Sequence, residues 1–301
     1  MLWRTWREAF EDLRRGPVLE ELGHAVQRSH LWRIAEHLDG ARLQRVEDDE
    51  LLDPDLFMGG VADRAAPLFL GRYSTDGLEY ALGRYGLWQR LAERARGALA
   101  IGIDGLGDSV QTLRIGDGGE QPLVELRAGL VSGDLDGPGG LPLTERPWLS
   151  IEWLCLQDPH RAFRADRRPL PGQDHPGLGV GREVMELLLI MGWRLGCAGL
   201  IGHPAWFHNA VMYRIHYRFL DPAEEGRMLA LLRAWQESGL SLAAFSWAMD
   251  RGRVVDEART PTAWKPGLMV APLAEEGEFQ DAAWDDAVER ARSQRFDVLA
   301  D

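Results

Sequence analysis

The feature that most limits how this chain can fold is a glycine-rich turn, residues 177–181, followed directly by a strongly apolar segment. The turn reads Gly-Leu-Gly-Val-Gly, and the apolar segment runs to about residue 195, where Gly196 follows it. An apolar run of this length that ends at glycine predicts a buried helix. Because a helix N-terminus offers unpaired N–H groups and the positive end of the helix dipole, the turn predicts a site for an anion such as a pyrophosphate.

Three familiar glycine-rich loops do not fit this segment. A dinucleotide loop of the form G-x-G-x-x-G would need glycine where Arg182 or Val184 stands. Lys265 is the only lysine, which excludes the Gly-Lys pair of a Walker A loop and a lysine Schiff base anywhere else in the chain. The turn also has no serine for a G-x-S-x-G nucleophile elbow. The segment is therefore either a different kind of phosphate loop or a simple entry into a helix.

Composition narrows the class of protein further. The chain has 301 residues, of which 45% are hydrophobic, so it can bury a sizeable core in one large or two ordinary domains. A net charge of −13 repels phosphate backbones and anionic lipids, so we expect neither nucleic acid nor a membrane as a partner. The two cysteines form no C-x-x-C pair, and His203, His208 and His216 have no nearby ligands that would complete a metal set. These features, with no signal peptide at the N-terminus, predict a cytoplasmic protein without a metal.

Hydrophobic periodicity and turn residues predict the order of elements along the chain. We expect a helical region over residues 1–75 and a helix over 76–97 that Asp76 caps. Asp221 and Pro222 indicate a second well-capped helix that ends at Gly239. The other predicted elements are strands at 98–104, 109–116, 122–129, 149–156 and 200–203, helices at 181–195 and 205–217, and a hairpin of 243–249 with 253–256. The fold class is α/β (α+β), a mixed, largely antiparallel sheet flanked by helices.

The turn and this order of elements resemble the GNAT superfamily of N-acetyltransferases. The family's loop has Arg or Gln, two residues, Gly, one residue, then Gly or Ala at the start of a helix, and here the segment begins with Pro176. The resemblance covers residues 76–256, which leaves 1–75 as a helical N-terminal region and 257–301 as a C-terminal extension with one helix. It implies transfer of an acyl group from acetyl-CoA or another acyl-CoA to an amine by direct attack. The acceptor would be a small molecule or a protein.

The resemblance also implies roles for individual residues. In the family, the central strand separates from its neighbour, and its amides contact the acyl-CoA while the glycine loop binds the pyrophosphate. Glu152 on that strand would be the general base, and Tyr213 would be the acid that protonates the departing thiolate. The cofactor-binding residues would be Leu154, Leu156, Gly177, Leu178, Gly179, Val180, Gly181, Arg182 and Asn209.

Each of these features also has a plain structural interpretation. Glu152 could be an ion-paired strand residue and Tyr213 a core aromatic. The arginines at 161, 164, 167 and 168 could pair with coenzyme A phosphates or simply solvate the polar insertion at 157–174. An alternative hypothesis is therefore a GNAT-like domain without turnover. Such a domain would act in binding or assembly, with Trp3 and Trp6 contacting a partner or a second copy in a homodimer.

Overall fold

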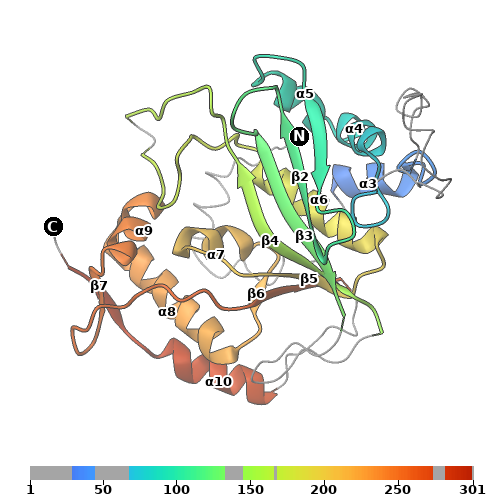
Figure 1. The fold of residues 1–301 in the computed structure, drawn as a ribbon. Helices are drawn as coiled ribbons and strands as arrows, with labels where there is room; N and C mark the ends of the chain where they lie inside the picture. Colours follow the sequence, from blue (N-terminus) through green and yellow to red (C-terminus); the bar gives the residue numbers. More distant parts are fainter. Residues whose placement is uncertain (1–28, 45–67, 133–144, 166–167, 274–281, 300–301) are drawn as a thin grey trace, which may run out of the picture.

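The computed structural model describes residues 29–44, 68–132, 145–165, 168–273 and 282–299. Its centre is a mixed, seven-stranded sheet with the strand order β1-β2-β3-β4-β5-β8-β6 (Figure 1). All neighbouring strands in this sheet are antiparallel except β4 and β5, which run parallel. The strands are β1 (Ala100–Asp104), β2 (Val110–Gly116), β3 (Val124–Val131), β4 (Trp148–Leu156), β5 (Gly199–Gly202), β6 (Arg218–Phe219) and β8 (Met269–Pro272). The predicted fold class of a largely antiparallel sheet with flanking helices is confirmed at this level.

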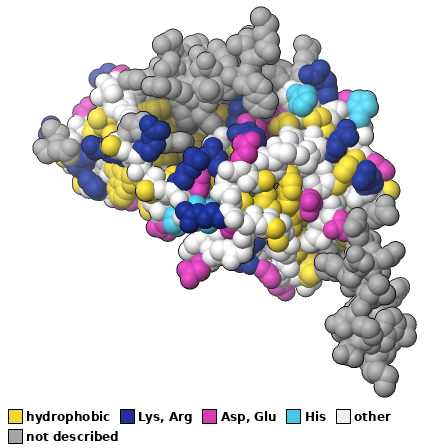
Figure 2. Space-filling model, turned by 90° about the horizontal axis from the view of Figure 1, so that it is seen from above, with side chains coloured by type: hydrophobic (Ala, Val, Ile, Leu, Met, Phe, Trp, Pro, Cys, Tyr) yellow, Lys and Arg dark blue, Asp and Glu magenta, His cyan; other side chains and the backbone are white. Residues whose placement is uncertain are grey.

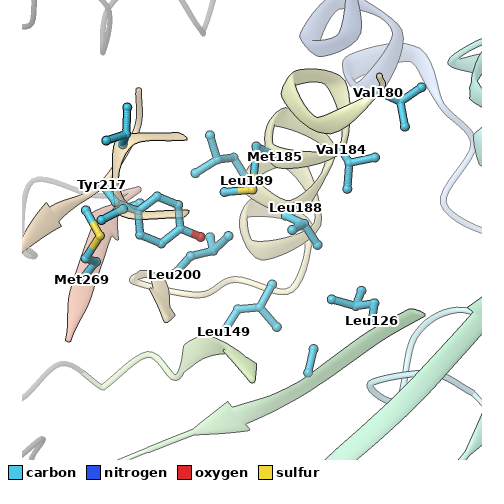
Figure 3. Close-up of a cluster of buried hydrophobic side chains, with 14 of the residues drawn as sticks. Leu126, Leu149, Val180, Val184, Met185, Leu188, Leu189, Leu200, Tyr217 and Met269 are labelled. Atoms are coloured by element: carbon cyan, nitrogen blue, oxygen red, sulfur yellow. The ribbon is translucent and has the colours of Figure 1, made fainter. Parts of the chain in front are cut away.

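Helix α6 (Gly181–Arg194) joins the two parallel strands and packs on the sheet. Its apolar residues Val184, Met185, Leu188 and Leu189 point toward side chains of β3, β4, β5 and β8 (Figure 3). The helix comes so close to β5 that a Cβ atom on Gly192 would lie 2.6 Å from the Leu200 side chain. Burial of this face, at roughly 25 cal/mol per Å² of apolar surface, holds the start of α6 at a fixed place over the sheet.

The predicted helix over 76–97 is two helices, α4 (Thr75–Arg84) and α5 (Leu87–Ala92). Gly86 separates them with a φ of 76°, a left-handed conformation that interrupts the helix. The N-cap is Ser74 and not Asp76, because the Ser74 hydroxyl accepts a hydrogen bond from the N–H of Gly77 at 3.0 Å. Asp76 lies in the first turn, where its charge still favours the helix dipole.

Helix α8 (Pro222–Ser238) has the ends that the sequence predicts. The Asp221 carboxylate accepts a hydrogen bond from the N–H of Ala223, and Gly239 ends the helix in the left-handed conformation. Its Glu225 is buried and forms an ion pair with buried Arg214 at 2.7 Å, and it also accepts a hydrogen bond from the N–H of Phe219 at 3.0 Å. This pair links α8 to β6 and to the end of α7 (Phe207–Tyr213).

The predicted hairpin of residues 243–249 with 253–256 is wrong. Residues Leu242–Asp250 form helix α9, which Ser241 caps through a hydrogen bond from the N–H of Ala244. Strand β7 (Val254–Asp256) pairs instead with β9 (Phe296–Val298), which follows α10 (Ala282–Arg292). Phe245, Ala248 and Met249 recur at helical spacing on the buried face, so tertiary burial favours the helix.

The main sheet extends beyond the predicted core at 76–256. Strand β8, at residues Met269–Pro272, lies between β5 and β6, so the segment predicted as a C-terminal extension supplies an inner strand. Helices α7, α8, α9 and α10 lie around this end of the sheet (Figure 1).

The described part of the N-terminal region includes helix α3 (His30–His37), which is capped by Ser29 and packs beside α6. The Arg194 guanidinium at the end of α6 donates hydrogen bonds to the carbonyls of Ala35 and Leu38. The predictions for residues 1–28, including Trp3 and Trp6, fall outside the described residues. No helix in the part of the chain that the structure describes has the length and apolar character that a bilayer crossing requires.

Candidate functional site

The candidate site begins where strand β4 loses its parallel neighbour. The pairing of β4 with β5 ends at Ile151 opposite Gly202, whereas β4 continues to Leu156 in its pairing with β3. Residues 152–156 therefore have one edge that β5 does not cover. An exposed strand edge presents free backbone N–H and C=O groups that a ligand can pair with.

Glu152 lies at a β-bulge that marks this point. In the register with β3, Arg127 faces Trp153 and Ala128 faces Ile151, so Glu152 is the extra residue without a partner. Its side chain is exposed, and the Ser150 hydroxyl donates a hydrogen bond to it at 2.5 Å. Bulges re-aim side chains next to functional sites, and this one places a carboxylate at the start of the uncovered edge.

The amides of Leu154 and Leu156 point toward the uncovered side of β4. The N–H of Gln157 donates to the carbonyl of Leu123 on the β3 side. Because backbone groups alternate along an antiparallel strand, the amides of Leu154 and Leu156 face away from β3. The carbonyl of Leu156 agrees with this direction, since it accepts a hydrogen bond from the N–H of Leu178 at 3.3 Å.

The glycine-rich turn is hydrogen-bonded to the end of β4. Gly177 forms an isolated antiparallel bridge with Gln157, and the N–H of Asp158 donates to the carbonyl of Pro176 at 2.7 Å. Leu178 and Val180 are buried in the core, so their side chains anchor the turn while its backbone remains at the surface end of α6. Two of the predicted cofactor-binding residues thus act as anchors through their side chains and can contact a ligand only through their backbones.

Gly179 is the residue of the turn that requires glycine. Its φ of 75° is left-handed, and an added Cβ atom would meet no atom of the described residues within 4 Å. The space beside the Gly179 backbone is therefore open, and no other described side chain occupies it. The Arg90 guanidinium, from α5, donates to the Gly179 carbonyl at 3.3 Å and pairs with Glu183 at 2.7 Å, which fixes the outer side of the turn.

No side chain among the described residues caps the N-terminus of α6. The N-cap residue is Val180, which has no side-chain acceptor, and Val184 donates to the Val180 carbonyl as the first turn closes. The amides of Gly181, Arg182 and Glu183 thus meet no capping side chain. The half-buried guanidinium of Arg182 adds positive charge at the same place, which is what a diphosphate requires.

Tyr213 and Asn209 lie on α7, the helix after β5. The Tyr213 ring packs against the Tyr217 ring with centroids 5.8 Å apart, and burial raises the pKa of Tyr213. The side-chain carbonyl of Asn209 accepts a hydrogen bond from the N–H of Trp206 at 3.1 Å, so it caps α7. This cap leaves the Asn209 amide nitrogen as the group that could contact a cofactor.

His216, which sequence reasoning treated only as a rejected metal ligand, lies within electrostatic reach of the start of α6. Burial, followed by the charges of Arg182 and Arg218, lowers its pKa to about 4. His216 is therefore neutral at physiological pH and adds no positive charge to the predicted anion site.

Basic side chains are present at this end of the molecule. The end of β4 lies at the top in Figure 1, and the view from above shows Lys and Arg side chains next to hydrophobic ones (Figure 2). Arg161 pairs with Asp158 at 3.3 Å, so one of the four insertion arginines already has a carboxylate partner. Arg167 falls outside the described residues.

Two other kinds of chemistry receive no support from the described residues. No group of three or more His, Cys, Asp or Glu side chains in the described ranges could hold a metal ion. Burial, followed by the charges of Glu125 and Asp174, raises the pKa of the Cys155 thiol. A thiol with a raised pKa is a poor nucleophile, which argues against an acyl-cysteine intermediate on β4.

The comparisons with known proteins give no family. No protein-family model matches this chain, and no curated protein matches it. The contribution of Arg90 and the bulge at Glu152 could not have been found from the sequence, because both depend on contacts between segments far apart in the chain.

Proposed function

We propose that this chain is a GNAT-like N-acyltransferase that moves an acyl group from acetyl-CoA or another acyl-CoA to an amine. The observation that carries the proposal is the uncovered edge of β4, which ends at a glycine turn and the uncapped N-terminus of α6. A pyrophosphate group needs clustered N–H donors, and a thioester needs an amide that polarises its carbonyl. Both kinds of donor lie here on consecutive segments.

In this proposal, the diphosphate of acyl-CoA binds the amides of the turn and of the first turn of α6. Gly179 provides the open space, Gly181 and Arg182 provide N–H groups, and the Arg182 side chain supplies a positive charge. The pantetheine arm then runs along β4 and pairs with the outward amides of Leu154 and Leu156. One of these amides donates to the thioester oxygen, where negative charge develops in the transition state.

The proposed reaction is a direct attack without a covalent enzyme intermediate. The amine nitrogen attacks the thioester carbonyl carbon, and the Glu152 carboxylate accepts the proton that the nitrogen loses. The C–N bond forms, the C–S bond breaks, and the thiolate of coenzyme A takes a proton from the Tyr213 hydroxyl. Burial raises the pKa of Tyr213, so this hydroxyl carries its proton at neutral pH.

A thiol-release assay with acetyl-CoA, longer acyl-CoAs and a panel of small amines and lysine peptides tests the proposal. Replacement Glu152→Gln should lower kcat by about 10²- to 10⁴-fold, the range typical of a lost general base. Glu120→Gln, which removes an exposed carboxylate from a turn between β2 and β3, is the matched control and should leave kcat unchanged. Equal rates for the two variants would remove Glu152 from the mechanism.

The alternative is a GNAT-like domain that binds acyl-CoA without turnover and acts as an assembly module. Binding of acetyl-CoA, together with no thiol release for any acceptor in the panel, would favour it. The free thiols of Cys155 and Cys197 fit a reducing compartment, so we propose a cytoplasmic location for either function.

A further inference from the structure

A small cavity outside the proposed acyl-CoA site has walls suited to an organic cation. It has a volume of about 160 Å³ and lies where the start of α7, one face of α9 and the segment before β8 meet. Its lining residues are Ala205, Trp206, Phe207, Ser246, Met249, Asp250, Ala263 and Trp264. The size is close to that of engineered protein cavities of about 150 Å³ that hold a benzene molecule.

The aromatic part of the lining is held in place by contacts between its own rings and with the backbone around the cavity. The rings of Phe207 and Trp264 meet edge to face with centroids 5.8 Å apart. The Trp264 indole N–H donates to the carbonyl of Pro204 at 2.9 Å. The indole of Trp206 packs so closely on the backbone at Gly172 that an added Cβ atom there would lie 2.7 Å from Nε1. Three aromatic side chains therefore surround the cavity at fixed positions.

The polar groups of the lining are a carboxylate and a hydroxyl oxygen, which suit a positively charged ligand. Asp250 is the only lining residue with a formal charge, and no hydrogen bond or ion pair of its carboxylate is found within the described ranges. The Ser246 hydroxyl, on a side chain that is only 2% exposed, also has no hydrogen-bond partner among those residues. A buried hydroxyl without a partner is costly, so its place in a cavity wall points to a ligand.

We infer that this cavity binds the ammonium group of a small organic cation. The faces of Trp and Phe rings attract cations through their quadrupoles, and the attraction is strongest where the cation is desolvated. The Asp250 carboxylate balances the charge at the rim, and the Ser246 oxygen accepts from an ammonium N–H or contacts a polarised methyl group. The inference goes beyond the proposed acyl transfer, because it requires no residue of the acyl-CoA site.

A ligand-observed NMR titration of the full chain tests the inference in the absence of acyl-CoA. The probes are choline and its uncharged carbon analogue 3,3-dimethylbutan-1-ol, which have nearly the same shape. We expect choline to bind about five- to thirtyfold more tightly, since cation–π attraction contributes about 1–2 kcal/mol at a desolvated site. Equal affinity of the two probes, or no binding of choline, would overturn the inference.

Three variants locate the binding site. Asp250→Asn should weaken choline binding about tenfold or less, because the carboxylate is at an exposed rim. Asp286→Asn removes the same charge from an exposed position on α10 and should leave the affinity unchanged, which controls for the acidic net charge. Trp206→Leu should abolish binding while the unfolding transition is retained. Equal effects of the two Asp variants, or undiminished binding by a folded Trp206→Leu variant, would contradict the site.

Discussion

Replacement of Gly179 by alanine separates a ligand-binding role of the glycine turn from a purely structural one. Gly179 has a φ of 75°, and a Cβ atom added there would have no neighbour within 4 Å, so the substitution creates strain but no clash. A left-handed conformation costs an L-residue about 1–2 kcal/mol, and the lower entropy of the unfolded alanine chain offsets up to about half of that. We expect a net loss of about 1 kcal/mol, or about 2 °C in Tm for a chain of this size.

Gly196 provides the matched control at the other end of the same helix. Its φ is 72°, and an added Cβ atom there also meets nothing within 4 Å. Gly196→Ala should therefore lose the same stability, because the backbone strain is the same. The two variants differ in their distance from the proposed diphosphate. The diphosphate must come within about 3 Å of the backbone beside Gly179 to accept hydrogen bonds from the N–H groups there.

Thermal unfolding with and without acetyl-CoA measures both effects. At about one hundred times the dissociation constant, acetyl-CoA should stabilise the wild-type chain and Gly196→Ala by about 2.7 kcal/mol. Gly179→Ala should show little of this stabilisation at the same concentration, because the new methyl group occupies the open space. If Gly179→Ala and Gly196→Ala respond equally to acetyl-CoA, the turn does not contact the diphosphate.

Further predictions concern the core that holds the site. Burial lowers the pKa of His208 to about 4, so the share of the stability that depends on His208 should fall by about 3 kcal/mol as the pH drops from 6.5 toward 4, because the unfolded state binds the proton first. His216, whose pKa burial also lowers to about 4, should add a similar loss. Urea unfolding of wild type and His208→Phe at pH 7 and pH 5 checks the His208 share, and equal pH dependence in the two proteins would contradict it. Arg214→Met should cost about 3–5 kcal/mol in urea unfolding, because it leaves the buried Glu225 carboxylate without its partner, and a loss below about 1 kcal/mol would show that this pair is not buried as described. Gly199→Val should prevent native folding, because its Cβ would lie 2.4 Å from the Trp148 ring. The measurement is the loss of a cooperative thermal transition. A variant with wild-type Tm would refute the close packing of β4 and β5.

The elements that local sequence determines could be predicted. Residues 181–194 form the expected helix because an unbroken apolar face ends at glycine, and Asp221, Pro222 and Gly239 set the ends of α8. The β1–β4 meander also follows its turn residues, with ends within about two residues of the prediction. In these segments the signals lie within a few residues of one another, so no distant contact was needed.

The elements that distant contacts determine could not be predicted. Residues 243–249 alternate enough to suggest a strand, yet Ser241 and the burial of Phe245 make them a helix. Strand β8 pairs with β5, which precedes it by almost seventy residues of chain, and the short apolar run at 268–271 does not indicate by itself which strand it joins. The same limit applies to the candidate site, where the loop residues are visible in the sequence but the bulge at Glu152 and the Arg90 contact are not.

Hydrogen exchange with mass spectrometry, with and without saturating acetyl-CoA, tests the central proposal most directly. The account predicts slower exchange in two segments, residues 153–156 of β4 and residues 179–183 of the turn and α6, because the outward amides of Leu154 and Leu156 and those of Gly181–Glu183 would donate to the ligand. The antiparallel pair β1 and β2 should exchange at an unchanged rate. Unchanged exchange in both predicted segments, or protection confined to another part of the chain, would contradict an acyl-CoA site between β4 and the start of α6.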